Sequence, residues 1–114
     1  MDGFRHVNNA VYLTYLEAAR DAFVAARAPE AVDSFVVRRV EIDYLAPLGQ
    51  DDGEALVSCD LEGVGASSVR LRETIRAASD GRVVAEARAV IVHVDEARTG
   101  ARPIPPEVRR QLEA

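Results

Sequence analysis

The sequence contains no lysine and no tryptophan, and Cys59 is its single cysteine. One cysteine excludes an intramolecular disulfide and any metal site built from several cysteines. Because Cys59 alternates with apolar neighbours in a strand-like run, we interpret it as a small buried residue. Aromatic residues make up only 5% of the chain. The core must therefore be packed mainly from Val, Leu, Ile and Ala.

Positive charge is scarce as well. The 14 basic residues, all arginine, are outnumbered by 19 acidic ones, for a net charge of −5. Such a chain repels polyanions, which argues against a nucleic-acid partner. No apolar run approaches the roughly 20 residues that cross a bilayer, and the opening residues do not resemble a signal peptide. We expect a cytoplasmic protein that binds no membrane, folded as a single domain over residues 1–114.

Hydrophobic periodicity divides the chain into one long helix and several strands. Apolar residues recur at spacings of three and four over residues 9–28, which predicts an amphipathic helix. The period then becomes two, which predicts strands over residues 34–44, 54–62, 67–78 and 82–95. Proline residues near 103–106 favour a short terminal helix ending near residue 112. The expected fold class is α+β, with the long helix lying against an antiparallel sheet.

The predicted strands also indicate which residues face the helix. On the last strand we expect a stripe of mostly small side chains, which lets a helix approach closely. This stripe comprises Val83, Ala85, Ala87, Ala89 and Ile91. On the first strand, one side should carry Val36, Val40, Ile42 and Tyr44.

The segment before the long helix carries the chemistry. It places Asp2 in a loop that leads into the predicted helix start near Asn9, with Asn8 as a suitable N-cap. Free backbone amides at a helix N-terminus carry partial positive charge and bind anions. A carboxylate facing such amides is the minimum apparatus for acyl transfer, because the acid attacks or activates water while the amides stabilise the oxyanion.

The same segment resembles the 4-hydroxybenzoyl-CoA thioesterase-like family of the hotdog superfamily. The likeness rests on Asp2, on His6-Val7-Asn8-Asn9, and on Tyr12-Leu13-Thr14-Tyr15-Leu16-Glu17 followed by Arg20. It continues through Gly65-Ala66-Ser67-Ser68 and Gly81-Arg82-Val83-Val84-Ala85-Glu86-Ala87. Arg5 departs from the pattern, which has glycine before the histidine. The resemblance implies a hotdog fold and an acyl-CoA thioesterase without a cofactor or a metal.

By this resemblance the catalytic residues are Asp2, His6, Asn9 and Glu17. Asp2 would attack the thioester or activate water, and the amide at Asn9 would hold the carbonyl oxygen. His6 is either a catalytic partner or, as we favour, a residue that positions the loop. Glu17 lines the acyl pocket and alternatively forms a helical pair with Arg20. The substrate-binding residues would be Asn8, Tyr12, Ser67 and Ser68, and the sequence itself adds Arg70 as a contact for the CoA phosphates. Arg70 shares its strand face with Arg72 and Arg76, and that face is equally typical of a solvated surface.

The resemblance also predicts a homo-oligomer, a dimer or a tetramer, with residues 34–44 pairing across a two-fold axis. It further implies a strand before Asp2. We therefore expect that Met1 is an internal methionine and that residues 54–62 form a sheet edge. Two other functions remain open. An enoyl-CoA hydratase would use an Asp-His dyad, but its Asn-Pro pair is absent here, and a non-catalytic acyl-CoA-binding module would not need Asp2.

Overall fold

The computed structural model describes residues 9–114, and it confirms the expected order of one long helix, four strands and a short helix. Short 3-10 turns, η1 (Pro29–Ser34) and η2 (Gln50–Asp52), flank the first strand, and the sequence pattern does not reveal them. The main elements are α1 (Asn9–Arg27), β1 (Phe35–Tyr44), β2 (Ala55–Val64), β3 (Ser68–Ala77), β4 (Val83–His93) and α2 (Pro106–Glu113).

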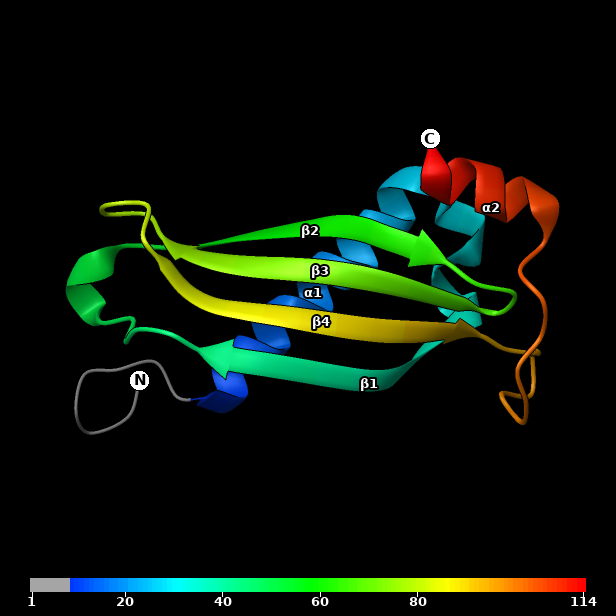
Figure 1. Cartoon of the computed structure of the whole chain (residues 1–114), viewed down its shortest axis with the longest axis horizontal. Coiled ribbons are helices and arrows are strands. Elements are labelled where there is room, and N and C mark those ends of the chain that lie inside the picture. Colours follow the sequence, from blue (N-terminus) through cyan, green and yellow to red (C-terminus); the bar gives the residue numbers. More distant parts are fainter. Residues whose placement is uncertain (1–8) are drawn as a thin grey trace.

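The strands form one antiparallel sheet in the order β1-β4-β3-β2. Within the described residues, β1 and β2 are therefore the two edge strands. Helix α1 crosses one face of this sheet diagonally, from the C-terminal end of β1 to the far side of β2 (Figure 1), and its closest backbone approach is to β2 and β3. Helix α2 lies at one end of the sheet, beside the C-terminal end of α1 (Figure 1). Among the described residues no helix covers the opposite face, which we call the outer face.

The core lies between α1 and the sheet and consists of two hydrophobic clusters. The first surrounds the C-terminal half of α1, and its buried members include Phe23, Val24, Val69, Leu71 and Ile91. The second surrounds the N-terminal half, and its buried members include Tyr12, Leu16, Ile75, Ala85 and Ala87. The small side chains of β4 face the helix as predicted, and Ala85, Ala87 and Ala89 are each at most 4% exposed.

Two irregularities overturn the predicted facing of single residues. On β1 the register shifts between Val37 and Arg39, so Val37 shares a face with Val40 while Val36 lies on the other face. On β4 an extra residue stands between the partners of Ile75 and Arg76. Val83 consequently pairs with Arg76 on the outer face. A bulge inserts one residue and so reverses the alternation beyond it, which a period-two pattern cannot reveal.

None of the helices formed by residues 9–114 is long and apolar enough to cross a membrane.

The packing of β3 against α1 yields a direct test of this core. Leu71 has no exposed surface, so Leu71→Ala should lower the free energy of unfolding by about 2–5 kcal/mol. Leu56 on the neighbouring strand is 50% exposed, and Leu56→Ala should change stability by at most about 0.5 kcal/mol. Urea denaturation followed by circular dichroism measures both, and equal losses would contradict this assignment of the core.

Candidate active site

Helix α1 begins at Asn9, as the sequence predicts. Its first-turn amides are therefore available where the resemblance requires an oxyanion-binding site. Asp2, His6 and Asn8 lie outside the described residues, as does the side chain of Asn9. Their catalytic and binding roles remain predictions.

The first turns of α1 pack against the segment that follows β1. Tyr12 is 3% exposed, and its ring lies 5.4 Å from the ring of Tyr44. Its hydroxyl is hydrogen-bonded to the backbone of Leu48, which is 2% exposed. Burial raises the pKa of Tyr12, so this phenol stays protonated at neutral pH. Tyr12 thus joins the beginning of α1 to the loop between β1 and β2.

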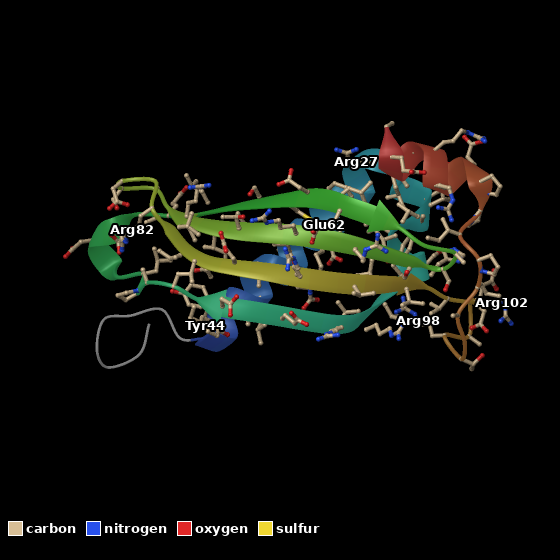
Figure 2. The ribbon with its side chains drawn as sticks, in the orientation of Figure 1. Arg27, Tyr44, Glu62, Arg82, Arg98 and Arg102 are labelled. Carbon is tan, nitrogen blue, oxygen red and sulfur yellow. The ribbon has the colours of Figure 1, made fainter. Side chains whose placement is uncertain are left out.

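An arginine fastens that loop to the β3–β4 turn. Arg82 donates from Nη1 and Nη2 to the two oxygens of Asp52, at 2.9 and 2.8 Å, and from Nη2 to the carbonyl of Pro47 at 2.8 Å. Nη1 also donates to Asp80 Oδ1 at 3.1 Å. Arg82 and Tyr44 lie at the same end of the molecule, opposite Arg98 and Arg102 (Figure 2). The sequence pattern did not predict this network, because Arg82 looks like an ordinary residue of a strand entry.

The same contacts hold Asp52 in its charged form. The Arg82 guanidinium and the backbone N–H of Gly49 donate hydrogen bonds to the Asp52 carboxylate. These bonds hold the pKa of Asp52 well below its usual range. The carboxylate therefore remains ionised throughout the neutral and mildly acidic range, and the loop remains clamped there.

Glu17 lies on the flank of α1 that faces β1. Its exposed side chain lines a cleft of about 450 Å³ together with Arg20 and Asp21. The apolar wall of this cleft includes Val24, Phe35 and Ile91. Because α1 crosses the sheet diagonally from β1 to β2 (Figure 1), its later turns diverge from the beginning of β1, and the cleft opens between them.

The predicted helical pair of Glu17 and Arg20 does not form. Arg20 instead turns toward the sheet, where its Nη1 donates to Glu73 Oε1 at 2.9 Å. Glu73 was not among the predicted functional residues, although a carboxylate on the inner face of a strand between Leu71 and Ile75 is a signal. A buried acid of this kind requires a partner.

Ser67 and Ser68 lie far from the first turns of α1. Ser68 opens β3, whereas Tyr12 and Leu16 pack against Ile75 and Ala77 at the other end of that strand. With about 3.3 Å per residue, the two ends of β3 are about 30 Å apart. One subunit therefore does not bring these serines to the beginning of its own α1.

Arg70 lies on the outer face and is exposed. Arg72 and Arg76 share that face, and Arg76 donates to the carbonyl of Gly81 at 3.1 Å. Within the described residues this arrangement fits a solvated surface, and the assignment of Arg70 to substrate binding remains a prediction.

Comparison with known proteins identifies the chain. A family model described as the thioesterase-like superfamily matches residues 1–112. The chain belongs to this superfamily. The resemblance seen in the sequence is thereby confirmed.

Individual members agree with this assignment. The long-chain acyl-CoA thioesterase FadM of Escherichia coli is 32% identical, over 99% of this chain and 89% of its own length. A Thermus thermophilus thioesterase solved with coenzyme A and zinc is 34% identical, with a TM-score of 0.87 over 100% of this chain and 89% of its own. A predicted thioesterase from Bacillus stearothermophilus is 28% identical, with a TM-score of 0.86 over 98% of this chain and 84% of its own. The hotdog fold is confirmed.

The thiol of this thioesterase-like chain is not poised for chemistry. Burial, and next the nearby Glu73 carboxylate, raise the pKa of Cys59 to about 12. The residue packs half-buried against the first hydrophobic cluster, as its strand-like neighbours predict. Across residues 9–114, His, Cys, Asp and Glu form no group of three or more that could hold a metal ion.

The clamp on the loop predicts a dependence of stability on pH. Because the pKa of Asp52 is lowered in the folded protein, its contribution is complete above the unfolded value of about 4 and decreases as the pH falls below it. Asp52→Asn should therefore lower the melting temperature at pH 7, and the difference from wild type should narrow toward pH 3. Asp51→Asn serves as the control. If the difference in melting temperature between wild type and Asp52→Asn were the same at pH 7 and pH 3, the stabilising role of the contact between Arg82 and Asp52 would be contradicted.

Proposed function

We propose that this protein is an acyl-CoA thioesterase, which hydrolyses an acyl-CoA to the free acid and CoA. Membership of the thioesterase-like superfamily over residues 1–112 carries this proposal. The beginning of α1 at Asn9, directly after the Asp2–Asn8 segment, agrees with it. Because acyl-CoA thioesters are intracellular metabolites, the proposed substrate also favours a cytoplasmic enzyme.

In this proposal the first-turn amides of α1, at Asn9 and the next residue, bind the carbonyl oxygen of the thioester. Negative charge that develops on this oxygen is stabilised by amides already held in place by the helix. Asp2 either attacks the carbonyl carbon or removes a proton from the attacking water. The C–S bond then breaks, and the CoA thiolate leaves and takes up a proton, from protonated Asp2 where Asp2 acted as the base and from water otherwise. Where Asp2 attacked directly, water then hydrolyses the acyl–Asp2 anhydride, which releases the free acid and restores Asp2. His6 positions the loop that carries Asp2.

The position of Glu17 on α1 favours Asp2 as the nucleophile or general base. Glu17 lies eight positions after Asn9, which corresponds to about 12 Å along the helix axis. A group that far from the first-turn amides does not reach the same carbonyl carbon. Glu17 instead lines the cleft beside β1, where it would contact the acyl chain.

The two acids can therefore be separated by kinetics. Asp2→Asn should lower kcat by a factor of about a thousand, because it removes the nucleophile or general base. Glu17→Gln should raise KM and change kcat little, because it alters binding alone. Release of CoA from a panel of short, long and aromatic acyl-CoAs measures both variants. The reverse ranking would move the catalytic role to α1.

The same panel tests the function itself. Cleavage by wild-type enzyme, without hydration of crotonyl-CoA, is the expected result. Hydration of crotonyl-CoA without cleavage would support a hydratase instead. Binding without turnover, measured by calorimetry, would support a non-catalytic module.

We also propose that the active site is shared between two subunits. If Ser67 and Ser68 contact the CoA arm, they cannot serve the α1 of their own subunit, because they lie at the far end of β3. A two-fold axis beside β1 would pair two copies of this strand antiparallel. The beginning of α1 in one subunit would then lie near the serine end of the other, which would bring the proposed groups together.

The exposed surface of β1 supports this dimer. Strand β1 is a sheet edge, and unpaired backbone groups at an edge favour pairing with another chain. Val37 is 50% exposed, Tyr44 is 42% exposed, and Leu45 just beyond the strand is 54% exposed. Burial of these side chains against a second copy would remove apolar surface from water.

Light scattering at micromolar concentration should therefore give the mass of a dimer or a tetramer for the wild-type protein. Val37→Glu places a charge at the proposed interface and should produce monomers. Leu56 is equally exposed but lies on β2 at the other edge. Leu56→Glu should therefore leave the dimer or tetramer intact. A wild-type monomer under these conditions would overturn the proposed dimer.

A further inference from the structure

A buried ion pair joins the middle of α1 to the middle of the sheet. Arg20 Nη1 lies 2.9 Å from Glu73 Oε1, and the two side chains are 9% and 0% exposed. The second carboxylate oxygen of Glu73 is buried without a hydrogen-bond partner. Burial raises the pKa of Glu73, and the hydrogen bond from Arg20 opposes this change. Such a pair, with one unsatisfied oxygen, connects the helix to the sheet at a large cost in desolvation free energy.

Stability alone does not account for this pair. Removing two charges from water carries a large desolvation penalty, and well-packed apolar residues often hold two elements together at least as strongly. The surroundings here would suit such residues, because Leu71 and Ile75 flank Glu73 on β3 and both have no exposed surface. Cys59, the β2 partner of Glu73, is a neutral thiol and does not compete for the charge of Arg20.

The apolar contacts of α1 leave its position along the sheet weakly defined. The two hydrophobic clusters lie on either side of Arg20, one around Leu16 and the other around Phe23. Beside Glu73, β4 presents alanine at positions 85, 87 and 89, whereas β3 itself presents Leu71 and Ile75. Apolar contact is non-directional, and alanine offers few ridges that would resist a sliding helix. A hydrogen-bonded ion pair, in contrast, has a defined length and direction.

We propose that Arg20 and Glu73 are positioning residues that fix the height and rotation of α1 on the sheet. This inference rests on the proposed thioesterase function, in which the first-turn amides of α1 hold the carbonyl oxygen. A small slide of the helix moves these amides by the same amount relative to the rest of the site. A displacement of about 1 Å can reduce a rate by about a hundredfold. Glu73 has no exposed surface and Arg20 shows only 8% of its surface at the edge of the cleft that Glu17 lines, so the pair acts on the reaction chiefly through the position of α1.

The decisive experiment separates positioning from stability by replacing both charges at once. In the double variant Arg20→Met with Glu73→Leu, the apolar side chains should keep the melting temperature at or above that of wild type. The register of α1 is lost, so kcat should fall at least tenfold while KM changes less than twofold. Arg20→Met alone should lower the melting temperature, because it leaves the Glu73 carboxylate buried and unpaired.

The exposed pair of Arg110 and Glu107 on α2 supplies the matched control. Their side chains are 70% and 73% exposed, so Arg110→Met with Glu107→Leu should alter neither kcat nor the melting temperature. Wild-type kcat in the Arg20/Glu73 double variant would overturn the proposal. So would a rise in KM at unchanged kcat. If wild-type protein cleaves no acyl-CoA, the proposed function fails instead.

Two conservative variants decide the question if the double variant does not fold. Glu73→Gln keeps an acceptor for Arg20 and should retain kcat within about threefold of wild type. Arg20→Lys keeps the charge but loses the planar fork that fixes its direction, and it should lower kcat more than threefold at unchanged KM. Equal kcat in Arg20→Lys and wild type would overturn the proposal.

Discussion

The structure depends on the contact between α1 and the inner face of the sheet. That contact is possible because β4 presents alanine at three successive inward positions, so that α1 and its aromatic side chains can approach the sheet. Tyr12 and Phe23, two of the three aromatic side chains of α1, are buried in this contact. The cleft beside β1 is a consequence of the same arrangement, because a helix that crosses the sheet diagonally diverges from the beginning of β1 and leaves a space there.

Much of this fold is predictable from local periodicity. The change from a spacing of three and four to a spacing of two places α1 and the four strands within a few residues of their observed bounds. The bulges at Arg38 and Val84 are not predictable in this way. A strand with one inserted residue contains the same types of residue as a regular strand, so its sequence does not show where the alternation of faces reverses. The pairing of Arg20 with Glu73 also escapes local reasoning. A helix pattern offers Glu17 as the nearer partner, and only the tertiary fold supplies one 53 residues away.

The candidate site is likewise predictable from the sequence only in part. Its chemistry follows from a motif whose residues are adjacent in sequence, and such a motif is visible in the order of residues alone. Its geometry depends on which end of each strand lies near the beginning of α1. Ser68 and Ile75 belong to one strand, but only Ile75 lies beneath the first half of the helix. A sequence gives the order of residues along a strand, but it does not show which end of that strand lies near the beginning of a distant helix.

The loop between β1 and β2 is held to the molecule chiefly by contacts at a few points. Leu48 is fixed to Tyr12, Ala46 donates to the carbonyl of Val84 at 3.2 Å, and Asp52 is fixed by Arg82. Pro47 and Asp51, which lie between these points, have exposed side chains. Substitution or insertion there would change the surroundings of the first turn of α1 and leave the sheet intact. The beginning of α1 can therefore acquire a different neighbourhood through one short surface segment, without redesign of the core.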